Sequence, residues 1–325
     1  MRNPVCLFSE SSGIRIVWGV YGKCSLNCKH CSVIKEDYKN PSIEKYKPLL
    51  KDMKSSGVDT IYISGGEPLL WKDIFGFIKL VKENGIIATL GTNGTEMNQR
   101  NVEKLSEIGI DKIFLSLDSH KEEVHNFLRG RDVFRRVING LRLLNEHKIF
   151  TRIDCVLWKE NYKSIEEFVN FCKNKDAEEI AFAWPMKVGN ASTNTSILIP
   201  ESEYLEVGRK LKSLKEKYSN EIKISYHRFD NFNCKGCNGG RKIFYIDWRG
   251  RLSPCFWISS INSESFTKKN IFEKKFSLLK ENKAIKDFVQ KEEKRKEKFG
   301  IGCPAICEIY NKNFYSKDPL FLLMD

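Results

Sequence analysis

The sequence predicts an α/β fold, a partial (β/α)6 barrel of the TIM type followed by a smaller α+β region. Two observations predict it. Short apolar runs alternate with longer amphipathic stretches over the first 190 residues, and after them this alternation stops. Alternating strands and helices imply a parallel sheet with right-handed crossovers. We therefore expect two domains, residues 1–200 forming the barrel and residues 201–325 forming the α+β region.

Six strands are expected in the first domain, with helices between them. The strands are the apolar runs 14–20, 60–64, 86–90, 112–117, 150–157 and 179–184. The helices are the amphipathic or charged stretches near 43–55, 73–84, 98–108, 132–147 and 163–174. In a parallel barrel the chemistry lies at the carboxyl ends of the strands, where the loops gather. Polar and cysteine residues directly after these strands are therefore the first candidates for a site.

The second region begins after a polar linker at 192–200. A helix is expected at 201–219, and a longer one near 272–298. Short strands are expected at 223–228, 242–247 and 252–256, with a turn at Arg249-Gly250 between the last two. A cysteine loop and a short tail follow the long helix. The mixture of short strands and helices predicts a small α+β unit.

Composition narrows the class of protein. The 325 residues are 41% hydrophobic, enough for a sizeable core, and no apolar run is long enough to span a membrane. Eleven cysteines without a secretory signal indicate a reducing, cytoplasmic location. The net charge is +13, but the densest charged run, 291–298, alternates in sign, which is typical of a solvated helix face. Nucleic-acid binding is therefore not expected.

Three cysteines, Cys24, Cys28 and Cys31, follow the first predicted strand in a C-x3-C-x2-C pattern. This tight loop offers three thiolates, whereas a cubic [4Fe–4S] cluster has four irons to ligate. One iron would stay open to a ligand other than protein. A zinc site is the alternative, and it would need a fourth protein ligand, for which His30 is the nearby candidate.

The run Gly65-Gly66-Glu67-Pro68 ends the second predicted strand. The cysteine loop followed by this run resembles the radical S-adenosylmethionine (radical SAM) superfamily. The resemblance implies that SAM chelates the open iron and that the Gly-Gly-Glu-Pro backbone holds the SAM amino group, since glycine lets the backbone approach a ligand closely. It also implies reductive cleavage of SAM to methionine and a 5′-deoxyadenosyl radical, which abstracts hydrogen from a substrate carbon.

The resemblance continues after the third and fourth predicted strands. It implies SAM-binding roles for Thr92 and Asn93, for Ser116 and Asp118, and for Arg129 in an H-x3-R-G stretch. The Arg129 fork would suit the SAM carboxylate. Capping of strand ends is the alternative for Ser116 and Asp118. After the sixth strand the family often has Gly-Arg-Ala, but here Asn190 replaces the arginine, which leaves an arginine contact to SAM from there without support.

A second set of cysteines lies near the C-terminus: Cys237, Cys255, Cys303 and Cys307. Their spacing suits a second [4Fe–4S] cluster or a four-cysteine zinc ribbon equally well. With Gly250, the first two form C-x12-G-x4-C, which resembles the SPASM or Twitch auxiliary-cluster extension. The resemblance implies one auxiliary [4Fe–4S] cluster on these four thiols. Cys234 is either a substitute ligand for Cys237 or a spare thiol that donates a hydrogen atom to a substrate radical.

The resemblance implies a radical SAM enzyme acting on a ribosomally synthesised peptide or protein by crosslinking, oxidation or epimerisation, with the auxiliary cluster taking up an electron. Two alternatives stay open: an enzyme for a small molecule in cofactor, sugar or antibiotic biosynthesis, and an iron–sulfur electron carrier or redox sensor. A flavodoxin or ferredoxin is the expected reductant. Because 23 residues precede Cys24, a peptide substrate is expected to need a separate recognition protein or another docking surface.

Overall fold

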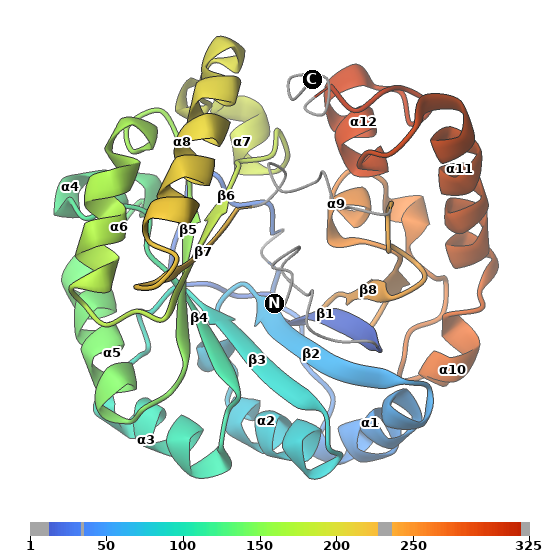
Figure 1. The fold of residues 1–325 in the computed structure, drawn as a ribbon. Coiled ribbons are helices and arrows are strands. Elements are labelled where there is room, and N and C mark those ends of the chain that lie inside the picture. Colours follow the sequence, from blue (N-terminus) through green and yellow to red (C-terminus); the bar gives the residue numbers. More distant parts are fainter. Residues whose placement is uncertain (1–12, 34–35, 227–235, 320–325) are drawn as a thin grey trace.

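The computed structural model describes residues 13–33, 36–226 and 236–319 (Figure 1). One nine-stranded sheet runs in the order β7-β6-β5-β4-β3-β2-β1-β8-β9. The strands are β1 Ile14–Tyr21, β2 Val58–Gly65, β3 Ile87–Thr92, β4 Lys112–Ser116, β5 Thr151–Val156, β6 Glu179–Ala183, β7 Lys223–Tyr226, β8 Ile243–Ile246 and β9 Leu252–Ser253. Neighbouring strands from β7 to β8 are all parallel, and β9 alone pairs antiparallel. The sheet curves into an open barrel (Figure 1).

Helices cover the outer face of this sheet, as Figure 1 shows. They are α1 Tyr46–Ser55, α2 Ile74–Glu83, α3 Gln99–Ile108, α4 Glu122–Arg129, α5 Phe134–Glu146, α6 Ile165–Lys173, α7 Asn190–Thr193, α8 Tyr204–Lys217, α9 Phe256–Ser259, α10 Phe276–Leu279, α11 Lys283–Phe299 and α12 Pro304–Asn311. Local signals set their ends. Helix α3, for example, begins where the Asn98 side chain accepts from the Asn101 N–H, and it ends at Gly109 with φ 72°.

The core lies between the sheet and the helices. Trp18 of β1 packs edge-on against Phe77 of α2, with ring centroids 5.1 Å apart. Tyr46 of α1 contacts both Phe77 and Phe272, with centroids 5.2 Å apart in each case. Phe272 comes from the C-terminal region, so aromatic burial joins that region to the barrel in one continuous hydrophobic cluster.

The predicted fold class is confirmed: this is an α/β fold with a parallel barrel-like sheet, and β1 to β6 match the six predicted strands. Three later strands extend the sheet, β7 at one edge and β8 and β9 at the other. Strand β7 pairs with β6, and β8 pairs with β1, where Arg15 lies opposite Ile243. The expected boundary at residue 200 falls between α7 and α8, and strands from both sides of it share the sheet.

Several elements differ from the sequence prediction. The single helix predicted near 272–298 is two helices, α10 and α11, because the Asn282 side chain caps a new start by accepting from the Ala284 N–H. Helices α4 and α12 were not predicted. Residues 192–200 contain the end of α7 and a 3-10 turn rather than an extended linker. The last predicted strand is shortened to Leu252–Ser253, since Cys255 begins α9.

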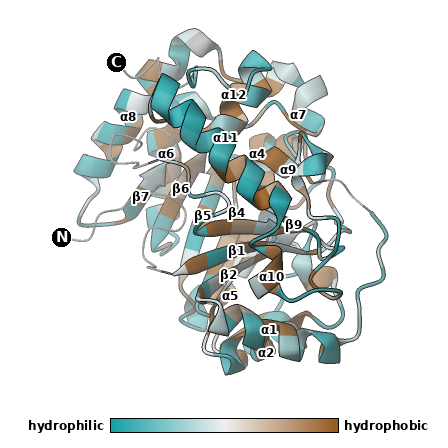
Figure 2. Cartoon of the chain, turned by 90° about the vertical axis from the view of Figure 1, so that its right-hand side faces the viewer, coloured by the Kyte–Doolittle hydropathy of each residue, from teal (hydrophilic) through white to brown (hydrophobic). Residues whose placement is uncertain are grey.

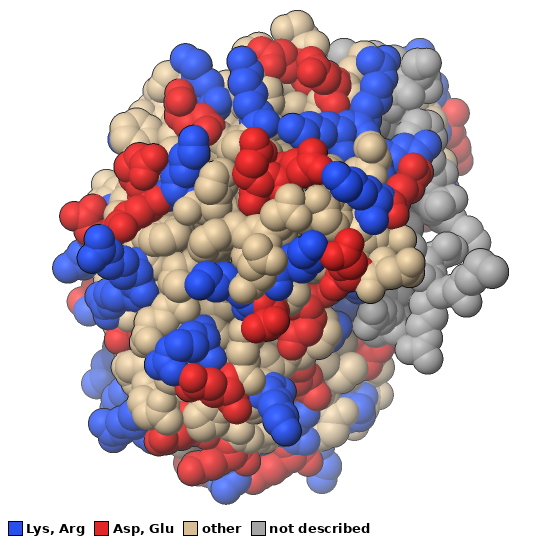
Figure 3. All heavy atoms as spheres, turned by 60° about the vertical axis from the view of Figure 1, so that its left-hand side comes forward, with Lys and Arg blue, Asp and Glu red and all other residues tan. Residues whose placement is uncertain are grey.

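The surface is charged but mixed. Figure 2 shows apolar strands inside and a largely polar α11 outside. On the face drawn in Figure 3, Lys and Arg are interspersed with Asp and Glu rather than gathered in one basic patch. In the described part of the chain, every helix is too short or too polar to cross a bilayer.

Candidate active site

The first three cysteines lie in the loop that leaves the carboxyl end of β1. Cys28 is buried, and Cys24 and Cys31 are half-buried; all three pack against Leu26 and Val133. Two N–H groups point at the Cys24 sulfur, the Leu26 amide at 3.4 Å and the Asn93 side chain at 3.5 Å. Such donors stabilise a thiolate that ligates a metal. The loop therefore gathers three thiols within a shell of hydrogen-bond donors.

Burial dominates the acidity of two of these thiols, Cys28 and Cys24. It raises the pKa of Cys28 to about 11, and Arg129 opposes this while the neighbouring thiols of Cys31 and Cys24 add to it. Burial also raises the pKa of Cys24. A bound cation would reverse this balance, because a coordinating thiol is deprotonated outright. The donor set therefore fits a metal centre better than three free thiols.

The spacing of the side chains bears on the kind of centre. Within the described residues, no three His, Cys, Asp or Glu side chains surround a point that would hold a single metal ion. A cubane makes a different demand, because each thiolate binds its own iron at a separate corner. Three thiols on one loop suit that arrangement.

Gly65 and Gly66 hold the end of β2 against the cysteine loop. The Gly66 amide donates to the Tyr21 carbonyl at 2.7 Å, and Gly65 has φ 135°. A Cβ on Gly66 would lie 2.2 Å from the Lys23 carbonyl oxygen. The sequence argument gave these glycines a close approach to a ligand. In the structure their lack of a side chain lets the backbone at the end of β2 approach the backbone after β1.

Glu67 is fully buried and joins two strand ends. Its carboxylate accepts hydrogen bonds from the backbone N–H of Asn93 at 2.8 Å, the Thr92 hydroxyl at 2.9 Å and the backbone N–H of Leu69 at 3.2 Å. Burial raises the pKa of Glu67 to about 7, against these three donors, which lower it. Pro68 follows as the first residue of a 3-10 turn. Since Asn93 also donates to Cys24, the network runs from Glu67 to the cysteine loop.

Asp118 and Arg129 meet beside the same loop. Arg129 closes α4 and donates to Asp118 through Nε at 2.6 Å and Nη2 at 3.0 Å, while Nη1 points at the Cys28 sulfur at 4.0 Å. The Val156 amide and the His125 ring complete the surroundings of the Asp118 carboxylate. Burial would raise the pKa of Asp118, but Arg129 and His125 outweigh it and hold that pKa below its usual range. Ser116, the last residue of β4, is half-buried nearby in the chain.

Sequence reasoning missed how Asn190 is used. Its side chain donates to the Cys28 carbonyl at 2.8 Å, and its amide donates to the Cys31 carbonyl at 2.9 Å. The preceding residue, Gly189, has φ 55°, and a Cβ there would lie 2.3 Å from the Cys31 oxygen. The segment after β6 therefore fastens the cysteine loop. The departure from the Gly-Arg-Ala pattern at Asn190 was the signal that could have found it.

The C-terminal cysteines also come together, from three separate places in the chain. Cys237 precedes β8, Cys255 begins α9, and Cys303 and Cys307 lie at the start of α12. Cys237, Cys255 and Cys303 pack around Ile258, Phe288 and Ala305. Burial raises the pKa of Cys237, with the thiols of Cys303 and Cys255 adding, and it raises the pKa of Cys307 to about 11. Cys234 lies outside the described residues.

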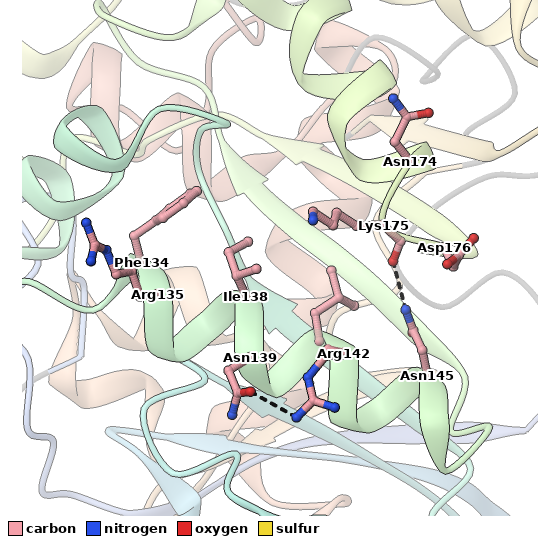
Figure 4. Close-up of a pocket in the computed structure, with 10 residues that line it drawn as sticks. Phe134, Arg135, Ile138, Asn139, Arg142, Asn145, Asn174, Lys175 and Asp176 are labelled. Atoms are coloured by element: carbon pink, nitrogen blue, oxygen red, sulfur yellow. Dashed lines mark hydrogen bonds between the residues drawn. The ribbon is translucent and has the colours of Figure 1, made fainter.

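Cys155 and Cys172 are buried in the barrel core, and the Cys155 sulfur lies 3.5 Å from the Asp118 carbonyl oxygen. One surface hollow is lined in part by Lys29 of the cysteine loop. The hollow in Figure 4, about 480 Å³, lies between α5 and the turn after α6 and is lined by side chains such as Arg142 and Asn145. It has no cysteine in its lining, so it adds nothing to the thiol sites.

The sequence is similar to that of a known protein family and of several characterised enzymes. Residues 18–172 match the model of the Radical SAM superfamily. An AdoMet-dependent heme synthase of Methanosarcina barkeri is 24% identical and spans 94% of this chain and 95% of its own length. A PqqA peptide cyclase of Bradyrhizobium diazoefficiens is 23% identical over 79% of this chain and 71% of its own.

The fold agrees with solved structures of similar proteins. Streptococcus suis SuiB bound to S-adenosylmethionine superposes with a TM-score of 0.78 at 20% identity, over 95% of this chain and 77% of SuiB. The matched segment, 18–172, contains the cysteine loop, the Gly-Gly-Glu-Pro run and Arg129. This chain belongs to the radical SAM superfamily of enzymes.

Proposed function

We propose that Cys24, Cys28 and Cys31 hold a [4Fe–4S] cluster that binds SAM, and that the enzyme removes hydrogen from a peptide substrate. When bound and reduced, by a flavodoxin or ferredoxin, this group supplies the electron that cleaves SAM to methionine and a 5′-deoxyadenosyl radical. The observation that carries the proposal is the buried three-thiol loop with N–H donors directed at Cys24.

The residues around the loop have separate tasks in this proposal. Asn190 and Gly66 fix the loop backbone, the first from the start of α7 and the second from the residue after β2. The Glu67 carboxylate orients the Thr92–Asn93 turn at the end of β3. Arg129 brings a positive charge toward Cys28, which favours the thiolate. A rigid shell of this kind holds a bound group in one orientation.

We also propose an auxiliary [4Fe–4S] cluster on Cys237, Cys255, Cys303 and Cys307, within residues 201–325 as a SPASM- or Twitch-like domain. The packing of Cys237, Cys255 and Cys303 around one small apolar cluster supports it, and Cys307 is a neighbour of Cys303 on the same helix start. A second redox centre near the substrate would take up the electron left after hydrogen removal, so that the overall reaction is an oxidation.

The comparisons favour two substrate classes. The names of the PqqA peptide cyclase and of the bacteriocin protein AlbA of Bacillus subtilis support a peptide. The match to an AdoMet-dependent heme synthase over almost the whole of both chains supports a heme precursor as the second candidate. Mass spectrometry after turnover separates them: a precursor peptide that loses hydrogen supports the first, and heme formed from an added heme precursor supports the second.

A direct test of SAM cleavage uses two buried cysteines. The reconstituted enzyme, reduced with dithionite, should form 5′-deoxyadenosine from SAM, and Cys28→Ser should abolish this. Cys172→Ser is the matched control, because Cys172 is also buried but lies in α6, and it should retain the activity. Retained activity in Cys28→Ser would overturn the proposal.

A further inference from the structure

The long helix α11 carries an arginine into the protein interior beside the C-terminal cysteines. The Arg295 side chain is fully buried, with no exposed surface. Arginine is almost never buried completely unless an anion or several acceptors satisfy it. The position of the charge therefore requires a partner.

The partners within the protein cover only part of the guanidinium. Nη2 donates to the carbonyls of Gly300 at 3.3 Å and Gly302 at 3.0 Å. The ion-pair contact from Nη2 to Glu292 Oε1 is long, 3.8 Å, and Arg241 binds the other oxygen, Oε2, at 3.1 Å. Among the residues that the structure describes, Nε and Nη1 are buried and have no acceptor. These two guanidinium nitrogens, Nε and Nη1, are therefore available to donate hydrogen bonds to a further group.

The turn that Arg295 contacts leads directly into the cysteines. Gly302 precedes Cys303, and Nη1 lies 3.5 Å from the place a Gly302 Cβ would occupy. The Cys303 amide is held from the other side by the Asp318 carboxylate at 2.9 Å. The free edge of the guanidinium therefore lies close to the turn carrying two of the four thiols.

We propose that Arg295 is a positioning residue for the auxiliary cluster, supplying a buried positive charge that raises its reduction potential. This inference rests on the proposed function, which puts a [4Fe–4S] cluster on Cys237, Cys255, Cys303 and Cys307. Net charge and hydrogen bonds to sulfur set the potential of such clusters. A cation favours the reduced form, which carries one more negative charge. It therefore makes the cluster a better acceptor for the electron of a substrate radical.

The test measures the midpoint potential of the auxiliary cluster by redox titration followed by electron paramagnetic resonance. The background is the full chain with Cys24, Cys28 and Cys31 replaced by alanine, so that only the second cluster contributes. Arg295→Met and Arg295→Gln remove the charge and should lower the midpoint. Arg295→Lys keeps the charge and should stay near the parent value. Lys294→Met removes an exposed charge from the neighbouring position and should leave the midpoint unchanged.

Two results would overturn the inference. Equal midpoints in Arg295→Gln, Arg295→Lys and the parent would show that the charge has no influence. An equal drop in Lys294→Met would show that any charge on α11 acts alike. If Arg295→Met loses its iron, the comparison of Arg295→Gln with Arg295→Lys still decides the question. A parent that binds no iron at all would refute the auxiliary cluster itself, a failure of the proposed function that iron analysis identifies before any titration.

Discussion

Arg129 and Asp118 form a two-point ion pair in the interior, with N–O distances of 2.6 and 3.0 Å. Neither charge is left to water, since both residues are buried. The pair takes two of the three guanidinium nitrogens and leaves Nη1 toward Cys28. The expected contact between Arg129 and the SAM carboxylate therefore stays a prediction, with one nitrogen still available for it.

Breaking this pair should destabilise the protein strongly. Asp118→Asn leaves the Arg129 charge buried without a counter-charge, and a loss of about 3–5 kcal/mol in unfolding free energy is expected. Asp154→Asn is the control, because Arg152 binds Asp154 with the same two-point geometry but the Asp154 side chain is 29% exposed. Urea unfolding should show the smaller loss in Asp154→Asn. Equal losses of unfolding free energy in the two variants would mean that the deeper burial of the Asp118 pair does not increase the cost of breaking it.

Glu67 should make stability depend on pH. Its pKa is raised from an ordinary value of 4.5 to about 7 in the folded protein, so the folded state binds the proton more tightly than the unfolded state does. The stabilisation that the folded protein gains from this tighter proton binding is complete below about pH 4.5 and is lost as the pH rises through about 7. Relative to Glu67→Gln, wild type should therefore lose stability between pH 5 and pH 8 in urea titrations. Parallel curves for the two proteins would contradict the raised pKa.

Asn190→Ala should loosen the cysteine loop without unfolding the barrel. One side-chain hydrogen bond to the Cys28 carbonyl is lost, worth about 1 kcal/mol, which corresponds to roughly a fivefold change in an equilibrium. Release of iron from the reconstituted enzyme to a chelator should be faster by about that factor. The matched control is Asn145→Ala, which removes the amide-to-carbonyl bond to Lys175 drawn in Figure 4. Equal release from both variants would exclude a role for Asn190 in holding the loop.

Gly66→Ala should disrupt the junction of β1 and β2. The new methyl group would meet the Lys23 carbonyl at 2.2 Å, and a backbone atom cannot yield as a flexible side chain does. A loss of about 1–3 kcal/mol and a reduced iron content after reconstitution are expected. Gly76 lies in helix α2, and in Gly76→Ala the methyl group would meet the Ile43 side chain at 3.7 Å, an ordinary van der Waals distance. The Gly76→Ala protein should therefore be as stable as wild type or slightly more stable. A normal iron content in Gly66→Ala would contradict the steric argument.

Much of the fold could be predicted because local patterns and tertiary packing agree over β1 to β6. Elements at the edge of the site were harder. Helix α4 was not predicted although it ends on Arg129, since its sequence was interpreted only as a motif. Helix α12 begins at Pro304 between two cysteines that suggested a loop. Strand β8 resembles any short strand, and only long-range pairing reveals that it extends the sheet beside β1.

The site itself was predicted as residue types at strand ends, and the structure adds the contacts among them. No sequence pattern indicates that Glu67 accepts from Thr92 and Asn93, residues about 25 positions away. The contact of Asn190 with the Cys28 carbonyl spans 162 positions. Such pairings depend on the order of strands in the sheet, which brings loops from β1, β2, β3 and β6 to one end of the barrel.

The measurement that tests the account most directly is the iron and sulfide content after anaerobic reconstitution. Wild type is compared with the variant in which Cys24, Cys28 and Cys31 are all replaced by alanine. Two cubanes predict about eight irons in wild type and about four in the variant. About four irons falling to none, with zinc bound instead, would make the C-terminal cysteines a structural zinc site and contradict the two-cluster account.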